Sequence, residues 1–155
     1  MTSRPAEPRD LPNVRRLLHA HRLPIDGVDD HVGTMVVVEE EGRLIGSAAL
    51  EIYDQAALLR SVAVDPDFQG SGIGHQLTRE ALALARARGV ETLYLLTTTA
   101  EQFFPRFGFE RIDRAKVPES IRGSIEFTSA CPSSAAVMRL TLGAARPLVS
   151  RPPVD

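Results

Sequence analysis

Apolar residues in this chain follow two spacings, and each spacing predicts a different element. Short apolar or alternating runs bounded by turn residues are typical of strands, whereas apolar residues three and four apart are typical of amphipathic helices. The first pattern predicts strands at residues 34–39, 44–53, 56–64, 91–97, 109–113 and 135–142, with an edge strand or extended lead-in at residues 4–9. The second predicts helices at residues 11–23, 73–88 and 98–107, and a short one near residues 25–31.

The connections between these elements predict the topology of the sheet. Tight turns join the strands at residues 34–39, 44–53 and 56–64, so these three form an antiparallel meander. The helix at residues 73–88 separates the third of them from the strand at 91–97, which is typical of a parallel pair. We therefore expect an α/β (α+β) fold, with a mixed, mostly antiparallel sheet of about six to seven strands and about four helices. Residues 1–142 form one domain, and residues 143–155, with three prolines and no aromatic residue, form a disordered tail.

Composition excludes several classes of partner and site. The 155 residues carry a formal net charge of −2, which favours neither nucleic acid nor an anionic membrane surface. The chain has no long apolar run or leader pattern, so we expect a cytoplasmic protein, either a monomer or a homodimer. The single cysteine, Cys131, excludes an internal disulfide and has no neighbouring histidine to activate it. His19 and His21 are two apart on a predicted helix and face different directions, so no metal site is expected.

A glycine-rich loop between the strand at 56–64 and the helix at 73–88 carries the clearest chemistry. Gly70, Gly72 and Gly74 stand at alternate positions directly before the helix. The amides of a helix N-terminus have no intrahelical partner and carry a partial positive charge, so the loop favours a phosphate or pyrophosphate. A P-loop is excluded because Lys116 is the only lysine, and the glycine spacing differs from that of the dinucleotide fingerprint. The alternative is a purely structural glycine turn.

The loop Gln69-Gly70-Ser71-Gly72-Ile73-Gly74, behind the strand end Val62-Ala63-Val64-Asp65-Pro66, resembles the acetyl-CoA signature of the GNAT N-acetyltransferases. The resemblance covers residues 1–142 and implies the GNAT fold, acetyl-CoA as co-substrate and an acyl-transfer activity. It implies that acetyl-CoA contacts Val62, Ala63, Val64, Gln69, Gly70, Ser71, Gly72, Ile73, Gly74, His75, Phe103 and Phe104.

Acyl transfer to an amine requires oxyanion stabilisation and a route for the amine proton. The resemblance assigns the first role to backbone N–H groups of Val62 and Ala63, near a bulge. For the second we expect the carboxylate of Glu51, although a solvated strand residue with no catalytic role fits its position at least as well. Phe104 occupies a position where many relatives have a tyrosine that protonates the departing thiolate. A phenylalanine cannot donate this proton, so the general acid is left open.

The acceptor is predicted only as a class. Residues 95–101, 103–104 and 108–109 resemble N-acetylglutamate synthases, whereas residues 117–122 and 131–135 more closely resemble the small arsenic-resistance N-acetyltransferases. This resemblance implies a small amino-acid-like amine, including an arsenic-containing amino acid, as the acceptor. Arg60, Thr98 and Arg122 are the candidate acceptor contacts, with pairing to Glu51 as the alternative role of Arg60. The alternative functions are a non-catalytic acetyl-CoA-binding regulatory module and a protein N-acetyltransferase.

Overall fold

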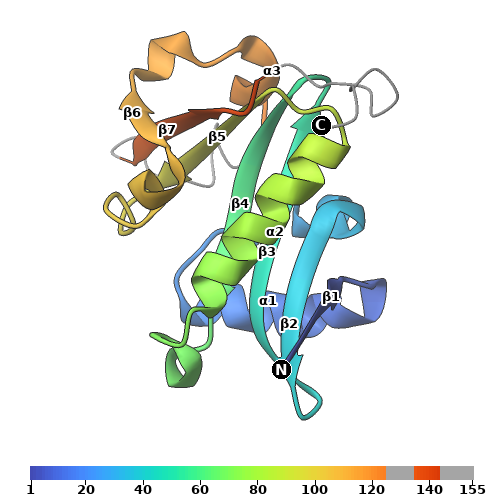
Figure 1. The fold of residues 1–155 in the computed structure, drawn as a ribbon. Coiled ribbons are helices and arrows are strands. Elements are labelled where there is room, and N and C mark those ends of the chain that lie inside the picture. The colour runs from blue at the N-terminus through green and yellow to red at the C-terminus, as the bar shows by residue number, and fades with distance from the viewer. Residues whose placement is uncertain (125–134, 144–155) are drawn as a thin grey trace, which may run out of the picture.

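The computed structural model describes residues 1–124 and 135–143 of the chain, and a seven-stranded sheet runs through them (Figure 1). The strands lie in the order β1-β2-β3-β4-β5-β7-β6, with only β4 and β5 parallel. Their bounds are β1 (Thr2–Pro5), β2 (Met35–Glu40), β3 (Arg43–Tyr53), β4 (Ala56–Val64), β5 (Thr92–Thr97), β6 (Glu110–Ile112) and β7 (Ala136–Thr141). The predicted mixed sheet, its antiparallel meander and the parallel pair are confirmed.

Within residues 1–124 and 135–143, three α-helices and five short 3₁₀ turns connect the strands. The α-helices are α1 (Leu11–Ala20), α2 (Ile73–Ala87) and α3 (Glu119–Arg122), and the 3₁₀ turns are η1 (Pro8–Asp10), η2 (Val28–Thr34), η3 (Pro66–Phe68), η4 (Phe104–Phe107) and η5 (Arg114–Lys116). The prediction of an amphipathic helix at residues 98–107 is wrong, because only the 3₁₀ turn η4 is helical in this segment. The Thr97 hydroxyl accepts hydrogen bonds from the amides of Thr99 and Ala100. These bonds form a turn in place of the first turn of the predicted helix. Pro105 then lacks the N–H that an α-helix needs.

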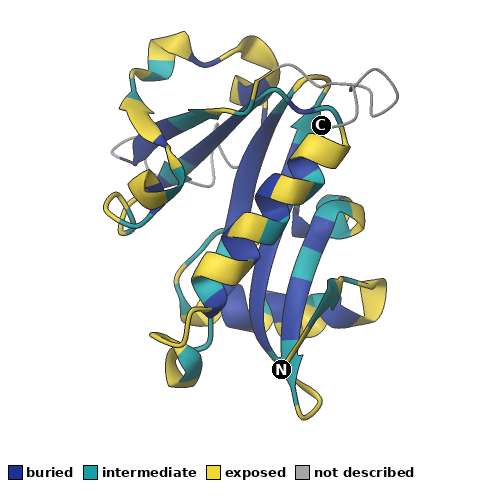
Figure 2. Ribbon diagram, in the orientation of Figure 1, coloured by how far each residue is buried: buried dark blue, intermediate teal, exposed yellow. Residues whose placement is uncertain are grey.

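The two faces of the sheet are covered by different helices (Figure 2). The apolar side of α2 packs on one face through Leu77, Ala81 and Ala85, which belong to the largest core cluster. On the opposite face, α1 packs through Val14, Leu17 and Leu18, and α3 packs through Ile121. Each helix therefore buries one apolar stripe, and the strands between the two layers are buried on both sides.

The middle of the sheet departs from regular pairing at two points. Ser47 pairs with Ala63 and Ala49 pairs with Arg60, so two residues of β4, Ser61 and Val62, lie opposite one residue of β3. This is a bulge, and Ser61 has a φ of +60°, which is uncommon for a residue other than glycine. In addition, β4 pairs with β5 only over residues 56–58, so beyond Leu58 the two parallel strands part. The bulge and the parted strands together open the centre of the sheet.

Several predictions concern residues outside the described part of the chain. Residues 125–134, which include Cys131, and residues 144–155 are not described, so the predicted tail is untested. Among the described residues, no helix is long and apolar enough to cross a bilayer. The described ranges 1–124 and 135–143 also contain no group of three or more histidine, cysteine, aspartate or glutamate residues that could hold a metal ion.

Candidate active site

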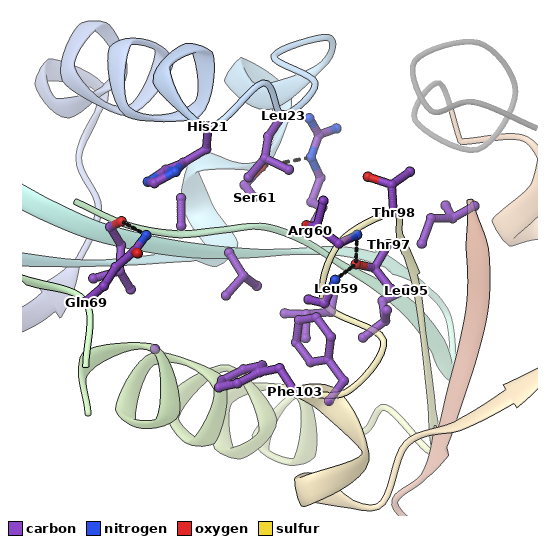
Figure 3. A pocket seen from close by; sticks show the side chains of 18 of the residues that line it. His21, Leu23, Leu59, Arg60, Ser61, Gln69, Leu95, Thr97, Thr98 and Phe103 are labelled. Atoms are coloured by element: carbon purple, nitrogen blue, oxygen red, sulfur yellow. Dashed lines mark hydrogen bonds between the residues drawn. The ribbon is translucent and has the colours of Figure 1, made fainter. Parts of the chain in front are cut away.

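A cavity of about 930 Å³ lies where β4 and β5 part (Figure 3). Residues 59–64 of β4 form one wall, and residues 95–100 at the end of β5 form the wall across from it. The glycine loop closes one end of the cavity, and residues 21–24, which follow α1, lie over it from the other face of the sheet. The cavity therefore passes through the sheet and joins the N-terminus of α2 to the region beside α1.

The glycine loop leaves the amides at the start of α2 without helical partners. Gly70 and Gly72 have φ values of +85° and +87°, which a glycine adopts without strain. The first bond within α2 runs from the Gln76 N–H to the Gly72 carbonyl at 3.0 Å, and no side chain caps the terminus. The N–H groups of residues 73–75 are therefore available to an anion, as the sequence predicts.

The polar side chains of the loop hold the loop itself. Gln69 Nε2 donates a hydrogen bond to the Val64 carbonyl at 3.2 Å, and Ser71 Oγ donates one to the Phe68 carbonyl. These bonds fix the loop against the end of β4. The anion site is thus formed by backbone amides, and Gln69 and Ser71 support its shape.

Aromatic side chains line the cavity between the loop and β5. The Phe103 and Phe104 rings meet edge to face at 5.1 Å between centroids, and Phe104 is only 6% exposed. Phe104 also packs on Phe109 at 5.7 Å. The His75 ring lies 4.8 Å from that of Phe107, which places His75 against η4 at the α2 end of the cavity. This wall is apolar and offers no hydroxyl at position 104.

The backbone of β4 beyond Leu58 borders the cavity. Residues Val62, Ala63 and Val64 line it, and among the described residues β5 gives them no strand partner. Backbone N–H groups on an unpaired strand edge can donate to a ligand, and the bulge at Ser61 sets their direction. A bulge, which the family resemblance implies, is present beside Val62 and Ala63, the residues predicted to contact the oxyanion.

Glu51 and Arg60 form a buried ion pair behind the cavity. Arg60 Nη1 donates a hydrogen bond to Glu51 Oε2 at 2.7 Å. Arg60 is 2% exposed and Glu51 is 1% exposed. The other carboxylate oxygen, Oε1, accepts from Tyr53 Oη at 2.6 Å and from Ser124 Oγ at 2.7 Å. His31 Nε2 lies 3.6 Å from Glu51 Oε2. The carboxylate is thus surrounded by donors.

These contacts decide which protonation states are favoured. Burial acts to raise the pKa of Glu51, but the hydrogen bonds from Tyr53, Ser124 and Arg60 outweigh it and hold that pKa below its usual value. Burial and the Glu51 carboxylate together raise the pKa of Tyr53 to about 12. Burial lowers the pKa of His31. Glu51 is therefore a firmly ionised acceptor and a weak proton acceptor, and it is not among the residues that line the cavity. The geometry favours the alternative role of Arg60, pairing with Glu51, and the burial of Glu51 does not fit the solvated strand residue expected as its alternative.

The three candidate acceptor contacts divide into two groups. Arg60 and Thr98 line the cavity at the end away from Gln69 (Figure 3). Arg60 also donates from Nη2 to the Pro24 carbonyl at 3.3 Å, which ties β4 to the segment after α1. Arg122 is exposed on α3 and is not among the described residues that line the cavity, so its contact with the acceptor stays a prediction. Helix α3 buries the neighbouring Ile121 and turns Arg122 to solvent.

The sequence patterns missed the residues that follow α1. His21 and Arg22 line the cavity, and Arg22 has a φ of +56° where the chain turns away from the helix. No motif marks them, and the helix predicted at residues 11–23 includes both, whereas α1 ends at Ala20. With them, the ionisable residues lining the described cavity are His21, Arg22, Arg60, His75 and Arg106, and none of the described lining residues is an aspartate or a glutamate.

The chain belongs to the GNAT acetyltransferase family, because the model of the acetyltransferase (GNAT) domain matches residues 31–111, more than half of its length. It is 31% identical over 98 residues to an uncharacterized N-acetyltransferase of Chlorobaculum tepidum, a match that covers 63% of each protein. It is 30% identical over 108 residues to an amino-acid acetyltransferase of Neisseria meningitidis, which covers 68% of this chain and 24% of the relative. The chain thus spans less than two thirds of the length of these curated relatives.

Solved structures share the fold over almost the whole chain. A Mycobacterium tuberculosis protein crystallised in complex with CoA superposes with a TM-score of 0.78 at 26% identity, covering 92% of this chain and 99% of that one. The N-acetylglutamate synthase of Neisseria gonorrhoeae, complexed with coenzyme A and N-acetyl-glutamate, has a TM-score of 0.78 at 23% identity, covering 91% and 35%. The predicted fold is therefore confirmed.

Proposed function

We propose that this protein is an acetyl-CoA-dependent N-acetyltransferase that acts on the amine of a small amino-acid-like acceptor. The observation that carries the proposal is the sign of the cavity's charges. Its described ionisable residues are all histidine or arginine, at both ends of one continuous space. One end suits the phosphates of a nucleotide cofactor, and the other suits the carboxylate of an acceptor. Family membership and the amino-acid acetyltransferase relatives support the same assignment.

The described residues fit acetyl-CoA. The free amides of residues 73–75 would hold its phosphates, and the parted edge of β4 would take its extended chain. Phe103 and Phe104 would cover the apolar part of that chain. The CoA found in the M. tuberculosis relative supports this placement.

Acetyl-CoA supplies an activated acyl group, and the protein must hold the acceptor, stabilise an oxyanion and let a thiolate leave. The backbone amides of Val62 and Ala63 are the proposed oxyanion donors, since they border the cavity beside the bulge. Phe104 cannot protonate the leaving sulfur. An alkyl thiol has a pKa of about 8.5, so it can leave as a thiolate near neutral pH without a general acid.

Two arginines give the acceptor end its preference. Arg60 is held by Glu51 and by the Pro24 carbonyl, and its side chain is fully buried in the cavity wall. Arg22 is an exposed residue that lines the same cavity and carries a second positive charge. An amino acid offers a carboxylate to these groups, whereas a polyamine would require acidic residues. Among amino-acid-like acceptors, we include the arsenic-containing amino acids suggested by the sequence.

Release of CoA thiol with a panel of amines tests the proposal. The panel contains free amino acids, an arsenic-containing amino acid, spermidine and a peptide with a free N-terminus. We expect turnover with at least one free amino acid, and a large loss when the carboxylate of that acceptor is esterified. Acetyl-CoA binding without turnover of any amine would indicate a regulatory module. Preference for the peptide would indicate a protein N-acetyltransferase.

A further inference from the structure

The proposed reaction leaves one proton unaccounted for. The α-amino group of an amino acid has a pKa well above 7, higher than the value of roughly 8 at chain termini, so most acceptor molecules reach the cavity as ammonium ions. Only the neutral amine can attack a thioester, so a nearby group must accept the proton. A carboxylate often serves, but none of the described cavity-lining residues is an aspartate or a glutamate, and Glu51 already accepts three hydrogen bonds.

Among the described residues that line the cavity, imidazoles are the remaining candidates, since histidine is the side chain that exchanges a proton near neutral pH. Two of these described residues are histidines, His21 and His75. His75 stacks against Phe107 at the glycine-loop end, where the cofactor's phosphates are expected. His21 lies after α1, in the segment that also supplies Arg22 and Pro24 to the acceptor end. Figure 3 shows its ring reaching from the end of α1 toward the strands.

His21 has an unmet hydrogen-bonding group. Its Nε2 atom is buried and has no hydrogen-bond partner among the described residues. An unsatisfied buried polar atom is costly, and such atoms often take a functional partner. A charged imidazolium would need acceptors for both of its N–H groups. A neutral imidazole carries one nitrogen that can accept a proton, and the buried Nε2 of His21 has no partner that would occupy it among the described residues.

We propose that His21 is the general base, which removes a proton from the acceptor's ammonium directly or through one water. The inference rests on the proposed function. The N–H bond breaks and the proton goes to the imidazole. The amine lone pair then forms the C–N bond, and the C–S bond breaks with its electron pair on sulfur. The second nitrogen proton, lost as the amide forms, balances the thiolate to give CoA thiol. His21 returns its proton to solvent.

The test compares His21→Gln and His21→Ala with His19→Ala. His19 is exposed on α1 two residues earlier, so it controls for loss of an imidazole from the same helix. We expect the His21 variants to lose roughly 10²- to 10⁴-fold in kcat/KM, the usual contribution of a general base. Their affinity for acetyl-CoA, measured by calorimetry, should stay within about 3-fold of wild type and thereby report a folded protein. His19→Ala should resemble wild type.

Two further readouts separate a base from a structural residue. Without a base, only amine that is already neutral reacts, so the rate of a His21 variant should rise about tenfold per pH unit up to the amine's own pKa. The loss of rate in the His21 variants should also be smallest for acceptors whose amines are weakly basic, because more of such an amine is already neutral. If wild type turns over an amino acid but the His21 variants match His19→Ala in rate and pH profile, His21 is not the base, while the proposed function stands. If wild type turns over no amine, both proposals fail.

Discussion

Replacing Glu51 by glutamine tests whether the buried carboxylate is a scaffold for Arg60 or a catalytic base. The substitution keeps the size and one oxygen acceptor but removes the charge that faces Arg60 Nη1 at 2.7 Å. Both residues are almost fully buried, so the guanidinium would be left without its counter-charge. Removing one member of a buried pair costs about 3–5 kcal/mol. Because the glutamine oxygen can still accept one bond, we expect a loss near the lower end, about 3 kcal/mol.

The assay is urea unfolding of wild type, Glu51→Gln and the double variant Glu51→Gln/Arg60→Met. The double variant removes both charges and fills the space with an apolar side chain, so it should recover much of the lost stability. The gap between wild type and Glu51→Gln should narrow as pH falls, since a carboxylate with a lowered pKa contributes its stability above its ordinary pKa and loses it as it protonates. For a domain of this size, about 3 kcal/mol corresponds to a fall in Tm of roughly 6–12 °C.

The same variant must then be assayed for turnover well below its unfolding transition. As a scaffold, Glu51 affects kcat only through the orientation of Arg60, so the loss should appear mainly in the KM of the acceptor, and the shape of the pH profile should be unchanged. A variant of unchanged stability with kcat reduced by roughly 10²-fold or more, and with the acidic limb of its pH profile lost, would show that Glu51 is the base. That result would also contradict the role assigned to His21.

Three further outcomes follow from the structure. Phe104→Tyr should fold and leave acetyl-CoA affinity within about 3-fold of wild type by calorimetry, with an equal or moderately higher kcat; a collapse in rate would contradict the packing role of the ring. Arg22→Ala should raise the acceptor KM by roughly tenfold while the exposed Arg122→Ala does not, measured by thiol release; equal effects would contradict the described acceptor end. The hydrogen bond from Arg4 lowers the pKa of Asp10 from its ordinary 3.8 to about 2. Asp10→Asn should therefore lower the free energy of unfolding by about 2 kcal/mol at neutral pH. That cost should vanish as the pH falls toward 2 in urea unfolding, and a constant cost would contradict the ion pair.

The positions of the strands, the meander and the parallel pair were predictable from the sequence because strand signals are local, whereas the place of β7 between β5 and β6 was not predicted. The runs that form β2, β3 and β4 are bounded by turn residues, and the pattern around α2 specifies a helix between two parallel strands. The segment at residues 98–107 failed because a side-chain turn at Thr97 and the missing N–H of Pro105 override its amphipathic spacing. Local competition of this kind is not visible in periodicity.

The site was predictable only where it depends on the backbone. The glycine loop could be placed because alternate glycines before a helix have a direct physical meaning. The partners of Glu51 come from β3, β4 and the end of α3, so its environment depends on tertiary contacts that no short motif contains. His21 was overlooked for the same reason: its place at the cavity depends on α1 ending just before it, at Ala20.

Calorimetry of acetyl-CoA binding to wild type, Gly72→Asn and Gly72→Asp tests the central claim most directly. Gly72 has a φ of +87°, and a Cβ there would meet no atom within 4 Å, so both variants have equal room and similar backbone strain. They differ in one negative charge at the N-terminus of α2. If the loop holds the cofactor's phosphates, Gly72→Asn should bind within roughly tenfold of wild type, whereas Gly72→Asp should lose about 100-fold or more through like-charge repulsion. Equal affinities for the two folded variants would contradict the claim that this loop is the cofactor site.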